Sequence, residues 1–272
     1  MDALQWCRDR LLVPGNPLAA SLLFVHPPQR ERILALRGLI TELAALDDPA
    51  AEQPVREARL GWWHQALAEG APHPALEAMT DSGADERVSP DLLLALLASI
   101  GSAAINQRFE RYEQLWSHCL AIGGQAGRLE ARLAEEGEQD DSAAAALGGA
   151  SYLIRIVRDL GLDARNDRWL VPLDLQAQFQ VARRDAINTR TGPGWDGLVR
   201  TLLERAVREG NAARSRLSTR HRHLHIHWAL DRRLAGQLVR RPGVIVQRRI
   251  LPGHAGNVWT AWRAARRLAQ QK

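Results

Sequence analysis

The sequence is poor in several residue types, and each scarcity narrows the possible fold. Cys7 and Cys119 are the only cysteines in 272 residues, so a disulfide framework is excluded. Free cysteines fit a reducing cytoplasm, where they are usually small buried residues. Two Tyr and three Phe are present, and apolar residues rarely alternate with polar ones, so signals of β-strands are few. The abundant Ala, Leu, Arg and Glu are strong helix formers and favour an all-α protein.

Long apolar runs are also missing. The longest run, "DLLLALLASIGSAAI" at 91–105, begins at an aspartate and is too short to span a bilayer. We interpret it as a buried core helix. The first residues, MDALQWCRDR, have neither the basic segment nor the apolar run of a signal peptide. These features predict a cytoplasmic protein.

Charge is distributed unevenly along the chain. Residues 201–272 hold 16 Lys and Arg against 3 Asp and Glu, a net charge of +13, whereas residues 1–200 carry 20 against 28, a net charge of −8. The basic segment suits anionic lipid headgroups at the inner membrane face, or a solvated surface that complements the acidic body. No recognised nucleic-acid module accompanies it, so we expect no nucleic-acid partner.

Helical periodicity recurs in seven segments. They are 30–46, 54–70, 90–105, 109–137, 141–165, 195–217 and 255–271. Pro and Gly interrupt the sequence between several of them, and neither an internal repeat nor a long Gly/Ser linker is present. We therefore expect a single all-α domain over 1–272, made of about ten helices, with an acidic body at 1–200 and basic C-terminal helices at 201–272.

One predicted helix carries a pair of aspartates. It begins near Asp141, passes through the small residues "AAAALGGA", which allow close helix approach, and ends after Arg165. Tyr152, Arg155, Asp159 and Asp163 follow one face at steps of three and four residues. Two like charges at this spacing repel by roughly 0.2–0.5 kcal/mol. Either a metal ion that holds a phosphate or a nearby arginine must compensate.

Six blocks of the sequence, in order, resemble the squalene/phytoene synthase family. "RDLGLDARNDRWLVP" at 158–172 is similar to the Asp-x-x-x-Asp motif of that family, which an arginine precedes. Ser21 with "LLF", Pro28 and Arg30 match its N-terminal segment, and "ALRGLITELAAL" at 35–46 stands where the first aspartate-rich helix lies. The other blocks are "RLGWW" at 59–63, "HPAL" at 73–76 and "CLAIGGQAGRL" at 119–129.

The resemblance implies an isoprenoid synthase helical bundle with a central cavity. The family joins two prenyl diphosphates, such as farnesyl or geranylgeranyl diphosphate, on Mg²⁺ held by two aspartate-rich helices. Mg²⁺ prefers oxygen ligands and neutralises the leaving diphosphate. By this resemblance, Asp159 and Asp163 are the expected metal ligands and, with Arg158, the catalytic residues. The expected substrate-binding residues are Ser21, Arg30, Asp48, Tyr152, Arg155 and Arg168.

The first aspartate-rich motif departs from the family pattern. Ala44 and Ala45 stand where metal-binding aspartates usually lie, and Asp48 precedes Pro49, which pushes its backbone out of the helical region. In the second motif, Arg155 replaces the usual Asn. Because Arg155 lies four residues before Asp159, we hypothesise that it pairs with that carboxylate and takes the place of the metal.

Two functions are compatible with this pattern. The first is a prenyltransferase-type protein of isoprenoid biosynthesis that binds prenyl diphosphate through Mg²⁺, with an impaired first motif. The second is a catalytically degenerate protein that acts in interaction or assembly, because "ITELAAL" more closely resembles the family branch that includes a mitochondrial complex I assembly factor. The sequence leaves open whether the protein is an active enzyme.

The histidines and tryptophans are further candidates for metal-binding and cavity-lining residues. "HRHLHIH" at 221–227 places two His pairs on helical faces, but each pair is only half a zinc site. A basic, partly protonated surface segment is the favoured interpretation. Among the nine Trp, we expect Trp63 and Trp169 near the cavity, because both lie in blocks that match the family.

Overall fold

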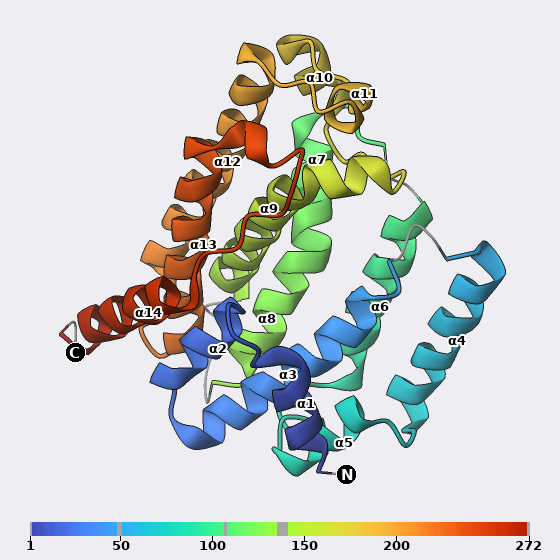
Figure 1. Ribbon diagram of the computed structural model, residues 1–272. Helices are drawn as coiled ribbons and strands as arrows, with labels where there is room; N and C mark the ends of the chain where they lie inside the picture. The colour runs from blue at the N-terminus through green and yellow to red at the C-terminus, as the bar shows by residue number, and fades with distance from the viewer. Residues whose placement is uncertain (1, 48–50, 106–107, 135–140, 271–272) are drawn as a thin grey trace.

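The computed structural model describes residues 2–47, 51–105, 108–134 and 141–270, and every regular element in these ranges is helical (Figure 1). The α-helices are α1 (Ala3–Leu11), α2 (Pro17–Ser21), α3 (Pro27–Ala44), α4 (Gln53–Glu69), α5 (Pro74–Asp81), α6 (Pro90–Ile105), α7 (Tyr112–Cys119), α8 (Gln125–Arg132), α9 (Asp141–Arg165), α10 (Leu173–Phe179), α11 (Arg183–Ile187), α12 (Pro193–Arg216), α13 (Arg222–Arg240) and α14 (His254–Ala269). The all-α prediction is confirmed.

Three further short helical segments lie within the described ranges. They are the 3₁₀ turns η1 (Leu22–Phe24) and η4 (Pro242–Val244) and the π-helical segment η2 (Leu120–Gly124). Within the segment expected as helical over 109–137, α7, η2 and α8 follow one another directly from Tyr112 to Arg132. The π-helical turn falls on Gly123 and Gly124, which have low helix propensity.

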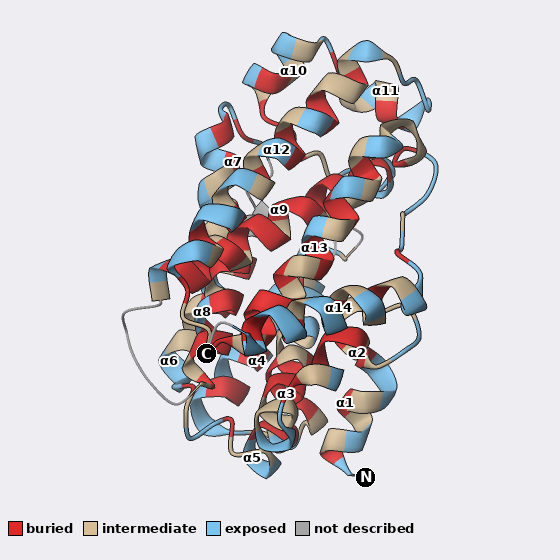
Figure 2. Cartoon of the chain, turned by 90° about the vertical axis from the view of Figure 1, so that its left-hand side faces the viewer, coloured by how far each residue is buried: buried red, intermediate tan, exposed pale blue. Residues whose placement is uncertain are grey.

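The helix α9 runs through the middle of the molecule and contacts α12, η2, α8 and α13 (Figure 2). Its small residues allow the expected close approach. A Cβ on Gly148 would lie 2.1 Å from the carbonyl oxygen of Gly123, and one on Gly127 would lie 2.2 Å from that of Ala144. Glycine is therefore required on both sides of the contact, because any side chain there would force α8, η2 and α9 apart.

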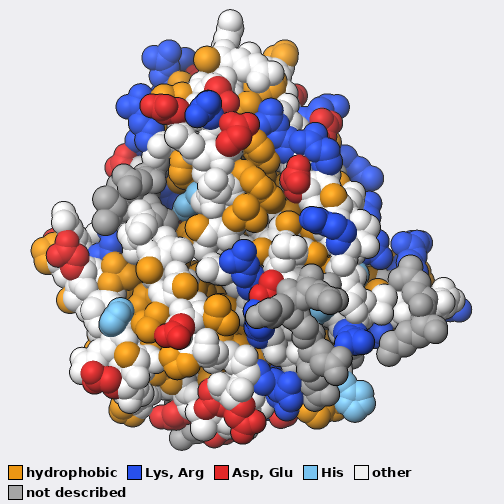
Figure 3. Space-filling view, turned by 180° about the vertical axis from the view of Figure 1, so that it is seen from behind, with side chains coloured by type: hydrophobic (Ala, Val, Ile, Leu, Met, Phe, Trp, Pro, Cys, Tyr) orange, Lys and Arg blue, Asp and Glu red, His pale blue; other side chains and the backbone are white. Residues whose placement is uncertain are grey.

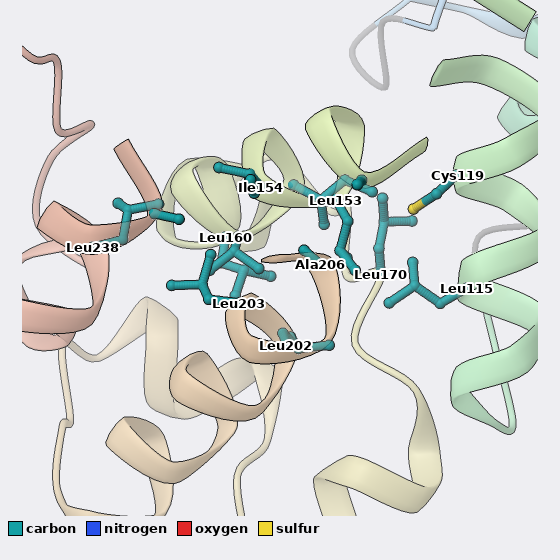
Figure 4. Close-up of a cluster of buried hydrophobic side chains, with 14 of the residues drawn as sticks. Leu115, Cys119, Leu153, Ile154, Leu160, Leu170, Leu202, Leu203, Ala206 and Leu238 are labelled. Carbon is teal, nitrogen blue, oxygen red and sulfur yellow. The ribbon is translucent and has the colours of Figure 1, made fainter. Parts of the chain in front are cut away.

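Two large apolar clusters flank α9. One combines its Leu153, Ile154 and Leu160 with residues of α7, α12 and α13 (Figure 4). The other gathers α1, α3, α5 and α6, and it includes the buried Leu96 and Ile100 of the helix expected from the apolar run at 91–105. Tyr152 contacts both clusters. A smaller cluster holds α14 against α2 and α13.

Figure 3 shows one face of the surface, seen from behind. Hydrophobic side chains gather at its lower left and centre, while Lys and Arg side chains are spread over the upper part, the centre and the right (Figure 3). Within the described ranges, none of the helices combines the length and the apolar content that crossing a bilayer requires.

Candidate functional site

The C-terminal part of α9 carries a cluster of carboxylates and arginines. Asp159 accepts two hydrogen bonds from Arg158, from Nε at 2.8 Å and from Nη2 at 2.6 Å. Its Oδ1 also accepts one from Nε of Arg249 at 2.6 Å. Arg249 lies 90 residues later in the chain, on the segment between η4 and α14. Both oxygens of Asp159 are thus bound by guanidinium groups.

A third arginine connects the two motif regions. Nη1 of Arg168 lies 2.8 Å from Asp47, just beyond the end of α3, and its Nη2 donates to the hydroxyl of Tyr152 at 3.3 Å. Its Nε lies 4.0 Å from Asp163. The side chain of Asp47 is only 8% exposed. Arg168 therefore bridges the first and second motif regions, through Asp47 of the first and Asp163 of the second.

Asp163 is the least neutralised carboxyl of this group. Burial raises the pKa of Asp163 to about 6; Arg168 and Arg249 lower the pKa, and Asp159 and Asp47 raise it further. These opposing influences place all four residues around Asp163. We call the set the Asp159 cluster: Asp47, Arg158, Asp159, Asp163, Arg168 and Arg249.

Next to the cluster, Tyr152 and His118 stay uncharged near neutral pH. Burial raises the pKa of Tyr152 to about 12, and burial together with the charge of Arg168 lowers the pKa of His118 to about 4. The two rings lie 5.8 Å apart between centroids. Arg168 lies between these uncharged rings and the carboxylates of Asp47 and Asp163.

A narrow cavity of about 80 Å³ lies beside Tyr152. Its apolar lining includes Ile40, Leu96, Ile100, Ile122, Leu147 and Leu224, and its polar lining includes Arg37, Ser151, Arg155 and His227. Pockets that hold drug-sized ligands measure about 300–1,000 Å³. In this conformation the cavity therefore has no room for a prenyl chain.

One buried ion-pair network fills the region next to this cavity. Arg37 donates from Nε to Glu130 at 2.9 Å, and its Nη2 pairs with the same oxygen. Nδ1 of His223 lies 2.5 Å from the other oxygen of Glu130, and its Nε2 lies 2.9 Å from the hydroxyl of Ser21. Burial by itself raises the pKa of Glu130, but Arg37 and His223 more than offset this and hold it well below its usual range.

Ser21, His223 and Glu130 are connected in the order of a serine–histidine–carboxylate relay. Ser21 has an exposed fraction of 0%, so a substrate has no access to its hydroxyl. That hydroxyl also donates to the carbonyl of Leu18. The arrangement is therefore structural, and we call these three residues with Arg37 the Glu130 network.

A second network surrounds Asp231 on α13. Burial raises the pKa of Asp231, while the charge of Arg155 and a hydrogen bond from Ser151 lower it. Nε2 of His227 lies 3.9 Å from Asp231. Burial and the nearby Arg37 keep the pKa of His227 well below its usual value, so this ring is neutral. We call Asp231, Ser151, Arg155 and His227 the Asp231 network. Arg155 thus lies in the interior of the bundle.

Arg155 differs from its expected role. It was expected to pair with Asp159, yet the structure shows Arg158 and Arg249 on that carboxylate and Asp231 as the acidic residue acting on Arg155. The four-residue spacing put Arg155 within reach of Asp159. A desolvated carboxylate on the neighbouring helix α13 offers a stronger attraction than one that already has two arginines.

The other expected substrate-binding residues are dispersed. Tyr152 and Arg168 lie together at the Asp159 cluster. Ser21 is sealed in the Glu130 network, and Arg30 donates to the carbonyl of Val25 at 3.0 Å. Asp48 lies outside the described residues.

The histidine segment 221–227 corrects an expectation. It was interpreted as a partly protonated surface, but His221, His223 and His225 are 4%, 1% and 5% exposed. Most of the segment belongs to α13, whose buried face packs on α9 and α12. Within the described ranges, His, Cys, Asp and Glu side chains form no group of three that could hold a metal.

The two tryptophans expected near the cavity lie elsewhere in the core. Trp63 packs in the cluster of α1, α3 and α6 with its ring 4.8 Å from that of His73. Trp169 contacts the cluster around α12. The cavity lining includes neither.

Several residues of these sites escaped the sequence analysis, although two left a signal. Glu130 shares the buried face of α8 with Ala126 and Leu129, and Asp231 shares that of α13 with Leu230 and Leu234. A lone carboxylate on an apolar helical face predicts a buried partner. Arg249 left no such signal, because its segment has no periodicity.

Comparison with known proteins decides the family. A family model described as Squalene/phytoene synthase matches residues 15–243, most of the chain. This chain belongs to the squalene/phytoene synthase family. The bundle is accordingly an isoprenoid synthase fold, as the resemblance implied.

Individual family members support the assignment over different lengths. The chain is 35% identical over 102 residues to a phytoene synthase of Thermus thermophilus. The matched region covers 36% of this chain and 35% of that protein. It is 23% identical over 216 residues to a chloroplastic phytoene synthase of Narcissus pseudonarcissus, covering 75% of this chain and 51% of that one. The chain thus spans about half or less of the length of these curated relatives.

Solved structures share the fold over nearly the whole chain. A dehydrosqualene synthase in complex with ligand superposes with a TM-score of 0.81 at 15% identity, covering 98% of this chain and 97% of that one. Squalene synthase HpnC from Alicyclobacillus acidocaldarius gives a TM-score of 0.71 at 19% identity, covering 89% and 94%.

The Asp159 cluster can be tested against the Mg²⁺ that the squalene/phytoene synthase family typically uses. The donor chemistry fits in part: Asp159 and Asp163 offer the carboxylate oxygens that Mg²⁺ prefers, although among the described residues they belong to no group of three acidic, His or Cys side chains that could hold a metal. The pKa of Asp163 is raised chiefly by burial and further by the neighbouring carboxylates Asp159 and Asp47, and a bound cation would favour its charged form. Arg158 and Arg249 compete for Asp159, so a metal there must displace guanidinium groups.

Proposed function

We propose that this protein, a member of an isoprenoid-biosynthesis family, binds a single prenyl diphosphate at the Asp159 cluster and does not join two of them head to head. The gathering of Asp159 and Asp163 with Arg158, Arg168 and Arg249 is the observation that carries the proposal. Asp159 and Asp163 would hold Mg²⁺, which supplies neutralisation of the diphosphate charge. Arg158, Arg168 and Arg249 would orient the phosphate oxygens, because guanidinium forks pair with them bidentately.

The first motif region and the small cavity inside the bundle support the restriction to one ligand. Ala44 and Ala45 of the first motif bring no carboxylate, and the described acids Glu42 and Asp47 of that region are already paired with Arg10 and Arg168. Arg37 and Arg155 line a cavity of about 80 Å³. One prenyl chain requires this cavity to widen, and two chains require far more space than it offers.

Calorimetric titration with farnesyl diphosphate, with and without Mg²⁺, tests the proposal. The wild type should bind only with Mg²⁺, and Asp159→Asn should weaken binding at least about tenfold, the equivalent of one charge-assisted contact. Asp167→Asn is the matched control, because Asp167 is 86% exposed and pairs with Arg183 outside the cluster. Geranylgeranyl diphosphate tests chain length.

A non-catalytic role in interaction or assembly is the second candidate. The Glu130 and Asp231 networks favour it, because they fill the interior with ion pairs where the family holds its substrate chains. Absence of binding to either diphosphate in the wild type would support this role and overturn the first. A condensation product from two diphosphates would contradict both.

We also propose that the protein contacts the membrane surface through α14. Its inner face buries Ala261, Ala265 and Leu268, whereas Trp259 and Trp262 are 58% and 37% exposed on the outer face and stack 4.8 Å apart. Arg266 covers the ring of Trp262. Exposed tryptophans among arginines are typical of helices that lie in a membrane interface.

Vesicle co-sedimentation tests this contact. Trp259→Ser should reduce binding to vesicles that contain phosphatidylglycerol, and salt should weaken it. Trp62→Ser on α4 is the control, because Trp62 is 45% exposed but lies away from the basic helices. Equal effects of the two substitutions would refute the assignment to α14.

A further inference from the structure

An open groove lined by arginines lies on the outer side of α13. It has a volume of about 530 Å³ and runs between the C-terminal end of α13 and the segment 248–253. This segment crosses the front of the molecule between η4 and α14 (Figure 1). The groove is lined by Arg240, Arg241, Arg248 and Arg249, with Ile250 and Leu251 among its apolar residues.

The charge of this groove is unbalanced. Arg240, Arg241 and Arg248 are exposed and, within the described ranges, have no acidic partner, while Arg249 pairs with Asp159. None of the lining residues is acidic. The four guanidinium groups around the groove repel one another, and their positive potentials add in the space between them. A bound anion would relieve this repulsion.

A helix end adds to the same positive potential. Gly253 lines the groove and is the N-cap of α14, a helix of 16 residues, and no side chain caps this end. The first N–H groups of a helix lack intrahelical partners and carry a partial positive charge. The arginines and the helix end therefore both favour a negatively charged ligand.

We propose that this arginine groove binds a phosphate or diphosphate group. Arginine forks match phosphate oxygens bidentately, and several of them favour a group with more than one negative charge. Leu251 is 63% exposed beside the arginines, which suits a phosphate carried on an apolar tail. The groove shares only Arg249 with the Asp159 cluster, so this inference goes beyond the proposed function.

Titration with inorganic diphosphate and inorganic phosphate in the absence of Mg²⁺ tests the groove. The wild type should bind diphosphate more tightly than phosphate. The double variant Arg240→Gln/Arg241→Gln should raise the dissociation constant at least about tenfold, because each lost charge-assisted contact is worth roughly that factor or more. Arg249 is left unchanged because it also pairs with Asp159.

The double variant Arg200→Gln/Arg263→Gln removes the same net charge from exposed positions outside the groove. It should change the dissociation constant less than about twofold, the effect of general charge alone. Equal weakening in both variants, or no binding of either anion and no groove-dependent binding of vesicles, would overturn the proposal. Thermal unfolding of each variant shows whether it is folded.

A second arm identifies the source of the phosphate. Vesicles of phosphatidylcholine with and without phosphatidic acid are compared in co-sedimentation. Loss of binding in Arg240→Gln/Arg241→Gln, with Trp259 intact, would indicate a lipid headgroup, whereas binding of soluble diphosphate alone would indicate a free anion. Because no Mg²⁺ is present, failure here is separate from failure of Mg²⁺-dependent farnesyl diphosphate binding at Asp159.

Discussion

The Glu130 network and the Asp159 cluster both pair carboxylates with cationic side chains, yet their burial differs. Glu130 is 4% exposed, and both of its oxygens are bound by Arg37 and His223. In the Asp159 cluster, Asp163 is 21% exposed and its closest cation stands 4.0 Å away. A buried, fully paired carboxylate stabilises the fold only while its partners remain. A partly exposed carboxyl with too little positive charge is free to take up a cation.

The pKa values express this difference in opposite directions. The pKa of Glu130 lies well below its usual range, and that of Asp163 is raised to about 6. The same acid-to-amide substitution should therefore have opposite effects on stability at the two places.

Glu130→Gln should lower the free energy of unfolding by about 3–5 kcal/mol at pH 7, because it leaves the buried Arg37 without its counter-charge. Urea unfolding measures this loss. Glu42→Gln is the control, since Glu42 pairs at 2.8 Å with the exposed Arg10, and it should cost less than about 1 kcal/mol. Similar losses in the two variants would mean that burial does not separate these pairs.

The wild type should also lose stability in acid through Glu130. Its pKa is lower in the folded than in the unfolded chain, where the value is near 4.5. The stabilisation is therefore present above pH 4.5 and disappears as the pH falls toward the folded pKa. The stability of Glu130→Gln should depend less on pH in this range.

Asp163→Asn should raise the free energy of unfolding at pH 7 by about 1–3 kcal/mol, since a shift of one pKa unit corresponds to about 1.4 kcal/mol. Asp163 has a folded pKa of about 6 against 3.8 in its unfolded form, so the wild type should gain stability as the pH falls from above 6 toward 4. Unfolding curves across this range measure the slope. A wild-type slope of the opposite sign, unchanged in the variant, would contradict the raised pKa.

Ser21→Ala should cost about 1 kcal/mol, because it removes the hydrogen bond between the hydroxyl and His223. Ser215→Ala is the control. Ser215 is exposed on α12 and donates only to the backbone of its own helix, so its replacement should be neutral or slightly stabilising. Thermal unfolding compares the two, and equal shifts would remove Ser21 from the network.

Asp159→Asn should have the smallest effect on stability, less than about 1 kcal/mol, because its guanidinium partners remain partly solvated. Farnesyl diphosphate binding should nevertheless weaken at least about tenfold in this variant and be retained in Glu130→Gln under conditions where that variant is folded. Calorimetry and urea unfolding on the same samples give both values. A large stability loss with binding intact would place Asp159 with the structural networks.

Much of the fold could be predicted because helical periodicity is a local property. All seven expected segments contain helix, and the helix with the aspartate pair ends at Arg165 as expected. The 19-residue helix α13 was missed, because the four histidines of 221–227, three of them inside α13, suggested a polar surface. Burial of a histidine depends on a partner from another helix, such as Glu130 for His223.

The sequence by itself determined the all-α class, the family resemblance, the loss of aspartates from the first motif and the spacing of Asp159 and Asp163. Those features are encoded in residue identity and helical period. Only the tertiary structure decided which arginine meets which carboxylate: Arg249 and Asp159 are 90 residues apart, and Arg37 and Glu130 are 93 apart. Such pairings depend on which helices lie side by side and on how much water the packing excludes, and neither quantity is local to any stretch of the chain.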